Sequence, residues 1–599
     1  MTSLGPGERV VVIGAGPAGL TAARELTKAG LRSVVIEKRA RVGGLARTET
    51  FKGFRFDMGG HRFFTKVEEM KKIWRGVLGD DLLRRPRLSR IYYNRRFFYY
   101  PLRPLNALLN LGPFVAARIV LSYLRWQLFP HVREDTFEQW VTNRFGRRLF
   151  LIFFKTYTEK VWGIPCSELR AEWAAQRIKD LSLRTALLHM LARPQTTITT
   201  LIEEFEYPRL GPGMMWEAVA AEIQRHQAVL RLNTEVVSVR RTGRRVDGVV
   251  VRAAGQEELI EGSHFISSMP VTELVAKLSP PAPAEVRAAA AKLVYRDFLT
   301  VCLIVRKPAL FADNWIYVHS PEVQVGRIQN FKNWSPDMVP DAEKTSLGLE
   351  YFCAENDSLW NMPDAELVEL GKRELERIGL ARAADVEDGC VFRNEKAYPV
   401  YDAGYRDCLA TVRTFVDGLE NLQTIGRNGL HRYNNQDHAM LTGVLATRNL
   451  LLDQQNDLWS VNTEQEYHEQ LLVGADVTPE YLARILELGL TKVFVKLDRV
   501  AFGLSVGAAA GLVLSLGTLF VVLGGGPLVR PTLGLLGQYF PGYEVTWSGT
   551  VVGLAYGFVV GFVGGWSFAF LRNACLFLWV AVLSRRANVY LLRRFLEFI

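Results

Sequence analysis

RVVVIGAGPAGLTAARELTKAG, residues 9–30, is the stretch that decides the fold. The apolar run from Val10 to Ile13 suits a strand buried on both faces, and the pattern after the run is helical. Between them, Gly14, Gly16 and Gly19 form a G-x-G-x-x-G turn, which allows close backbone approach to a pyrophosphate and close packing of helix on strand. The helix N-terminus favours the phosphate charge. The stretch therefore predicts an α/β, Rossmann-like domain that binds a dinucleotide.

A second apolar strand supports this interpretation. SVVIEK, residues 33–38, ends in Glu37, which lies 23 positions after Gly14. A carboxylate at this spacing accepts hydrogen bonds from a ribose diol. Strand, turn, helix, strand and acid occur in the order of a dinucleotide site, which argues against a glycine-rich turn without a ligand.

The residues after this acid indicate which dinucleotide is bound. KRARVGGLART, residues 38–48, places the doublet Gly43-Gly44 between Arg41 and Arg47. This sequence resembles the second fingerprint of the FAD-binding amine oxidase and protoporphyrinogen oxidase superfamily. The resemblance implies FAD as the cofactor, held by Arg41 and both glycines.

A third piece lies far along the chain, at NLQTIGRNGLHRYNNQDHAMLTGVLATRNL, residues 421–450. It resembles the C-terminal flavin segment of the superfamily, in which Gly426 and Arg427 lead into a helix that begins near Asp437. The resemblance implies that the helix N-terminus faces the carbonyl edge of the flavin.

We therefore expect a discontinuous FAD-binding domain with two inserts over one face, which would cover a substrate cleft. The expected parts are FAD-binding pieces at 1–105, 206–270 and 396–460, a mainly helical insert at 106–205, a mixed α/β substrate insert at 271–395, a helical linker at 461–498, and a membrane hairpin with an amphipathic tail at 499–599.

Composition limits the partners. Of 599 residues, 49% are apolar and 23% charged, as in a globular protein. The net charge of +11 is spread along the chain, which disfavours nucleic acid and favours an anionic substrate or a membrane surface. Six cysteines without a C-x-x-C pair predict neither a zinc site nor a disulfide framework, and with no leader they favour a reducing, cytoplasmic setting.

The C-terminal hundred residues differ from the rest. Residues 500–529 and 545–571 contain no charged residue, and each run exceeds the roughly 20 residues that cross a bilayer. Lysines and arginines flank the two runs on their outer sides, whereas the loop between them has only Arg530 and Glu544. The positive-inside rule then predicts two transmembrane helices with the FAD domain on the cytoplasmic side. Buried helices of a large soluble domain are the alternative.

Four stretches resemble UDP-galactopyranose mutase, in the same order along the chain. They are the G-x-H-x-F-x-T pattern of 59–65, YTEKVWG of 157–163, LVYRD of 293–297 and GRNGLHRYNNQDHA of 426–439. In that family, reduced FAD attacks the anomeric carbon of a UDP-sugar, displaces UDP, and returns to its starting redox state. The resemblance implies that Arg296 holds the diphosphate and that the loop of Gly59 and His61 lies beside the flavin. Tyr398 and Tyr401, in AYPVYD, are further candidate wall residues.

Two departures keep other functions open. RIKDLSLR, residues 177–184, has Leu181 where the mutase family has a second diphosphate arginine, and FEYPRLGPGMMWEAVA, residues 205–220, resembles the oxidase and desaturase side of the superfamily.

One hypothesis is a membrane-anchored, mutase-like flavoenzyme acting on a nucleotide-linked or lipid-linked sugar in cell-surface glycan synthesis. A second is an FAD-dependent oxidase or desaturase of a lipid-soluble substrate, and a third is a non-catalytic flavin-fold scaffold. His61 itself could be an ordinary core histidine. The sequence predicts no oligomeric state.

Overall fold

The computed structural model describes residues 9–65, 67–100, 102, 104–171, 204–462, 497–524 and 530–596. Two units make up the chain, Met1–Leu471 and Leu472–Ile599. RIKDLSLR and most of the expected helical linker lie outside the described residues.

A five-stranded parallel sheet forms the centre of the first unit. Its order is β20-β13-β1-β2-β9, built from β1 (Val10–Ile13), β2 (Ser33–Ile36), β9 (Val229–Arg231), β13 (His264–Ser267) and β20 (Leu422–Thr424). All four residues of β1 are buried, as expected for a strand covered on both faces. Since neighbouring strands come from three distant stretches of sequence, the α/β fold and its discontinuous sheet are confirmed.

Helices cover both faces of this sheet. On one face lie α1 (Pro17–Lys28), α2 (Glu68–Leu78), α10 (Gly213–Arg225) and α18 (Gln436–Leu452), which share a core containing Trp74, Trp216 and Met440. The other face carries the sheet β12-β11-β10-β14 with three helices. Its elements are β10 (Glu235–Thr242), β11 (Arg245–Ala253), β12 (Gln256–Glu261), β14 (Leu278–Ser279), α11 (Val271–Ala276), α12 (Ala284–Ala291) and α16 (Tyr405–Asp417).

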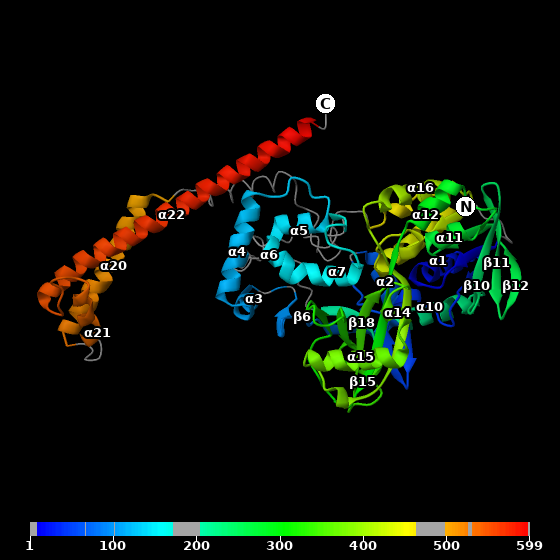
Figure 1. Cartoon of the computed structure of the whole chain (residues 1–599), viewed down its shortest axis with the longest axis horizontal. Helices are drawn as coiled ribbons and strands as arrows, with labels where there is room; N and C mark the ends of the chain where they lie inside the picture. Colours follow the sequence, from blue (N-terminus) through cyan, green and yellow to red (C-terminus); the bar gives the residue numbers. More distant parts are fainter. Residues whose placement is uncertain are drawn as a thin grey trace. The chain divides into compact units, whose positions relative to one another are not determined.

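A seven-stranded sheet forms a separate layer of the first unit (Figure 1). Its order is β19-β15-β18-β17-β16-β6-β7, from β6 (Ser89–Tyr93), β7 (Arg96–Tyr99), β15 (Tyr295–Val305), β16 (Trp315–Val318), β17 (Arg327–Asn330), β18 (Thr345–Cys353) and β19 (Val386–Pro399), with α15 (Asp364–Arg377) packed on it. The sheet thus also takes β6 and β7, which precede the helical insert in sequence.

The helical insert consists of α3 (Pro104–Leu111), α4 (Pro113–Leu128), α5 (Phe137–Phe145), α6 (Arg147–Phe150), a π-helical turn (Leu151–Lys155) and α7 (Thr156–Trp162). A capping box begins α5, since the Gln139 amide N–H donates to Thr136 Oγ1 at 3.3 Å and the Thr136 amide N–H donates to Gln139 Oε1 at 3.2 Å. Tyr157 of α7 contacts Tyr317 of β16 edge-on, which joins the helical insert to the seven-stranded sheet.

Two small antiparallel sheets complete the first unit: the hairpin of β3 (Thr48–Phe51) with β4 (Phe54–Asp57), and the pair of β5 (Leu82–Pro86) with β8 (Glu204–Pro208), which are distant in sequence. The fully buried Asp57 accepts hydrogen bonds from the hydroxyls of Thr48, at 2.8 Å, and Tyr207. Burial raises the pKa of Asp57 to about 7, although both hydrogen bonds lower it.

Because the pKa of Asp57 is raised, we expect the stability of the fold to depend on pH. Between about pH 4 and 7 the folded chain keeps a proton that the unfolded chain releases, so Asp57 removes up to about 4 kcal/mol of stability as the pH rises through this window. The buried His319 and His431, whose pKa values burial lowers to about 3 and 4, act with the opposite sign below about pH 6.5. We therefore expect Asp57→Asn to gain unfolding temperature relative to the wild type as the pH rises from about 5 to 8. Parallel melting curves for the two proteins would contradict the assignment.

The second unit contains two long helices, α20 (Arg499–Val522) and α22 (Trp547–Leu596), with the short α21 (Arg530–Gly534) between them. Glycines let α20 and α22 approach closely, because a Cβ on Gly507 or Gly511 would lie 2.7 Å from a carbonyl oxygen of α22. Residues 499–522 and 547–574 are long and apolar enough to cross a membrane, and only 22% and 17% of their apolar windows are buried. The segment after Arg572 prolongs the second helix, since α22 continues to Leu596.

Candidate functional site

A cavity opens where β1 and β2 end, the usual ligand position in a parallel sheet. Glu37 is buried at the end of β2, and its carboxylate accepts the amide N–H groups of Ala15 at 2.9 Å and Arg39 at 3.0 Å. The carboxylate is thereby fixed beside the glycine turn, in a position to accept hydrogen bonds from a ribose.

The glycine turn forms a close backbone cradle. Gly14 has φ +97°, and a Cβ on Gly19 would lie 1.9 Å from the Gly14 carbonyl oxygen, so both positions require glycine. Gly16 lines the cavity. A Cβ added to Gly44 would lie only 3.1 Å from the Gly16 Cα, so the two glycine backbones are in close contact. No side chain among the described residues caps the N-terminus of α1, which leaves amide N–H groups for a diphosphate. These features fit the pyrophosphate and ribose of FAD.

The third sequence piece forms the other end of the cavity. The Arg427 guanidinium donates to the carbonyl oxygens of Asn434, at 2.7 and 2.9 Å, and Ala397, at 2.9 Å, and lies 4.7 Å from the ring centre of Tyr433. Asp437 lies in the first turn of α18, and this turn lines the cavity. The N-terminus of a 17-residue helix therefore borders the site and favours negative charge there.

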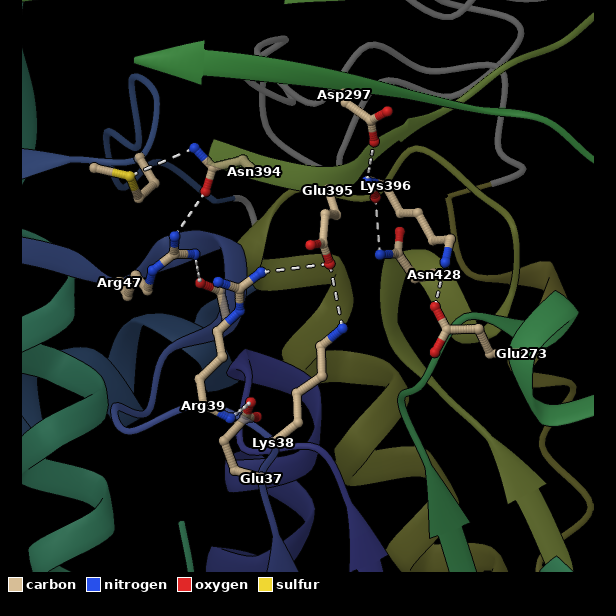
Figure 2. A network of polar contacts seen from close by, with 12 residues as sticks. Glu37, Lys38, Arg39, Arg47, Glu273, Asp297, Asn394, Glu395, Lys396 and Asn428 are labelled. Carbon is tan, nitrogen blue, oxygen red and sulfur yellow. Dashed lines mark hydrogen bonds and ion pairs between the residues drawn. The ribbon is translucent and has the colours of Figure 1, made fainter. Parts of the chain in front are cut away.

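Polar contacts tie the end of β19 to both sides of the cofactor half, as Figure 2 shows. On one side Glu395 pairs with Lys38 at 3.3 Å and Arg39 at 3.9 Å. On the other side Lys396 pairs with Glu273, and its carbonyl accepts Asn428 Nδ2 at 2.9 Å. The strand that carries Tyr398 is thereby held across the cavity.

His61 lines the cavity in the loop after β4. Its Nδ1 is 3.1 Å from the Gly59 carbonyl oxygen. Burial lowers the pKa of His61 to about 3, and the charges of Arg427 and Arg327 add to this effect. The imidazole is thus neutral near pH 7, and since a carbonyl can only accept, Nδ1 carries the proton and Nε2 is left as an acceptor.

Where the seven-stranded sheet lines the cavity, it carries a buried ion pair. Arg327 of β17 donates through Nη2 and Nε to one oxygen of Glu350, at 2.5 and 2.9 Å, and Gln329 Nε2 donates to the other at 2.9 Å. Glu350 is fully buried on β18. Burial lowers the pKa of Arg327, but the Glu350 charge outweighs it, so the pKa lies well above its usual value and the guanidinium stays charged.

Aromatic side chains line the rest of this part of the cavity, among them Trp315, Tyr317 and Trp334. Tyr398 also lines it, and its ring stacks on that of Tyr433 with centroids 5.7 Å apart.

The structure brings most of the predicted residues to this one cavity. The residues that line it are Gly14, Gly16, Glu37, Gly44, Gly59, His61, Tyr398, Gly426, Arg427 and Asp437. Among the described residues, Gly19, Arg41, Gly43, Arg296 and Tyr401 are not part of the lining. Gly19 instead packs helix on strand, and Tyr401 accepts the Tyr433 amide N–H at 2.7 Å from behind the wall.

Arg296 lies one layer away from the cavity. Its Nη1 is 3.2 Å from the Asp357 carboxylate, its Nη2 donates to the Phe352 carbonyl at 3.1 Å, and its guanidinium abuts Gly163 of the helical insert. Arg327 lines the cavity, and sequence reasoning missed it. The available signal was the acid Glu350 inside the buried run TSLGLEYFC, which requires a cationic or hydrogen-bonding partner nearby.

Comparisons with known proteins agree with this geometry. The family described as flavin containing amine oxidoreductase matches residues 17–451. Putrescine oxidase from Kocuria rosea is 53% identical over 51 residues, which cover 8% of this chain and 11% of that protein. Pseudooxynicotine dehydrogenase from Pseudomonas sp is 50% identical over 50 residues, covering 8% and 10%. The chain thus matches about a tenth of the length of these curated relatives.

Solved structures share the fold. Reduced UDP-galactopyranose mutase superposes with a TM-score of 0.67 at 22% identity, over 77% of this chain and 99% of that one. A putrescine oxidase triple mutant has a TM-score of 0.50 at 18% identity, over 75% and 99%.

Proposed function

Since this chain belongs to the flavin-containing amine oxidoreductase family and is an FAD-dependent enzyme, we propose that it is a membrane-anchored flavoenzyme acting on a nucleotide-linked or lipid-linked sugar in cell-surface glycan synthesis. The glycine cradle and Glu37 would hold the adenosine and diphosphate half of FAD, and the loop of His61 and the N-terminus of α18 would border its ring. FAD supplies a nucleophilic ring nitrogen when reduced and a hydride acceptor when oxidised.

One observation carries the proposal: the cavity is cationic. Eight lysines and arginines line it, against five aspartates and glutamates, and His61 is neutral. Such a lining attracts a diphosphate, and an arginine is suited to bind one. We assign diphosphate binding to Arg327 in place of Arg296, because Arg327 is the one that lines the cavity.

The other wall residues would orient the sugar and exclude water. The neutral His61 offers Nε2 as an acceptor to a hydroxyl, while its one proton, on Nδ1, is donated to the Gly59 carbonyl near pH 7. Tyr398 and the surrounding aromatic rings make the wall rigid and largely apolar. Tyr401 would act as a positioning residue through Tyr433.

Oxidation of a lipid-soluble substrate is the second candidate, favoured by the family match and by the short stretch that is 53% identical to putrescine oxidase. The cationic lining weighs against a protonated amine, which Arg327 and Arg427 would repel. It does not weigh against a neutral polyene, or against a porphyrinogen, whose carboxylates are anionic.

An assay of the purified, detergent-solubilised protein separates the candidates. The flavin is reduced with dithionite without oxygen, UDP-galactopyranose or UDP-galactofuranose is added, and the nucleotide sugars are separated by chromatography. Interconversion that requires reduced flavin is the expected result. If both sugars are recovered unchanged while an amine, porphyrinogen or polyene bleaches the oxidised flavin, the sugar proposal is wrong.

A further inference from the structure

The outward face of α4 is apolar where a soluble protein would be polar. Phe114, Leu121, Leu124 and Leu128 are 86%, 65%, 50% and 57% exposed. They are spaced by seven, three and four residues, so they form one stripe along the helix, which we call the α4 stripe. In contrast, Ile119 is the only fully buried side chain among the described residues of α4.

Neighbouring segments extend this surface. Figure 1 shows α4 along the outer edge of the helical insert, with α5, α6 and α7 on one side of it. Leu109 of α3 and Phe129 and Val132 after α4 are 71%, 70% and 88% exposed. Single exposed leucines are common, but a contiguous set of this kind marks an interaction surface.

The charges on α4 itself have one sign. Its charged residues are Arg118 and Arg125, and the first acids after it in sequence are Glu134 and Asp135. Arg118 and Arg125 are exposed on α4, seven residues apart and interleaved with the α4 stripe. A helix whose exposed face combines large apolar residues with arginines, and carries no acid, is typical of one that lies in the interface of an anionic bilayer.

We propose that the α4 stripe is a second membrane contact, lying at the boundary between headgroups and acyl chains while Arg118 and Arg125 bind anionic lipid headgroups. A second copy of the chain is a poorer occupant, because it would oppose arginines to arginines. The chain's own end, residues 585–599, carries four arginines and one glutamate and is disfavoured for the same reason. This contact does not depend on the reaction in the cavity.

Spin labels on the full-length protein test the proposal. A nitroxide is attached at Leu121→Cys, with Cys390, Cys408 and Cys575 replaced by serine, and the protein is placed in detergent, in phosphatidylcholine discs, or in discs that also contain phosphatidylglycerol. In the anionic discs we expect the collision rate of the label with a water-soluble nickel complex to fall several-fold and its collision rate with oxygen to rise. The matched control is Leu452→Cys, 58% exposed at the end of α18, which should not respond. Arg118→Gln with Arg125→Gln should remove the effect of the anionic lipid.

Two results would overturn the proposal. A Leu121 label as open to nickel as the Leu452 label in anionic discs means that no lipid covers α4. A Leu121 label shielded from both reagents already in detergent means that protein covers it. A label at Leu512→Cys, on the exposed side of α20, reports the C-terminal anchor separately: if it stays in water while the Leu121 label enters lipid, the α4 contact holds and the anchor fails.

Discussion

Replacing Arg327 with methionine is expected to lower kcat/KM by about 10²–10³-fold, the effect of removing a preorganised charged donor from an active site. Arg327 lines the cavity and is paired with the buried Glu350, so its side chain is oriented before any substrate arrives. Steady-state rates in the nucleotide-sugar assay, with flavin content measured on the same sample, give the loss.

The same change also destabilises the fold, which has to be separated from catalysis. Arg327→Met leaves the Glu350 carboxylate buried without its cation, at a cost of about 3–5 kcal/mol. Arg327→Met with Glu350→Gln removes both charges and should recover most of the unfolding temperature while the activity stays low. Recovery of turnover in this double variant would show that Arg327 is only structural.

Arg296→Met is the matched control for Arg327→Met. It removes an arginine from the same sheet whose guanidinium contacts Asp357 and Phe352 outside the cavity lining. We expect Arg296→Met to lose far less activity than Arg327→Met. The reverse order would restore Arg296, the residue we favoured from the sequence, as the diphosphate ligand.

This pair of arginines shows why the two halves of the site were not equally predictable. The cofactor half is encoded by contiguous strand–turn–helix pieces, where residue spacing fixes geometry, so Gly14, Gly16 and Glu37 could be placed from the sequence. The substrate half depends on which strands pair. Arg327 lies opposite Glu350 only because β17 and β18 are antiparallel neighbours in that register, and local sequence does not encode this pairing.

Strand-end geometry limited the other predictions in the same way. Tyr398 and Tyr401 are three residues apart, yet the first lines the cavity and the second supports Tyr433 from behind. The chain leaves β19 after Pro399, so strand alternation could not rank the two tyrosines. The exposed apolar face of α4 was likewise invisible, because helical periodicity identifies an apolar side but not whether protein covers it.

Alanine substitutions at Gly16 and at Gly19, both in the glycine turn after β1, should affect FAD binding and unfolding temperature differently. Gly16→Ala is expected to weaken FAD binding by at least about tenfold, since one lost close contact to the diphosphate costs roughly 1.5–3 kcal/mol. The Cβ would enter the cavity side of the cradle, where its nearest protein atom is 3.8 Å away, and Gly16 has φ −82°, which alanine adopts freely. The unfolding temperature of the flavin-free protein should therefore stay unchanged.

Gly19→Ala should damage both properties. Its Cβ would lie 1.9 Å from the Gly14 carbonyl oxygen and 3.3 Å from Val12, so α1 must move away from β1 before any cofactor binds. We expect the flavin-free protein to melt at a clearly lower temperature than Gly16→Ala and to retain less FAD on gel filtration. Equal melting temperatures for the two variants would mean that α1 can shift without cost, and that the tight packing of helix on strand is not what builds the phosphate cradle.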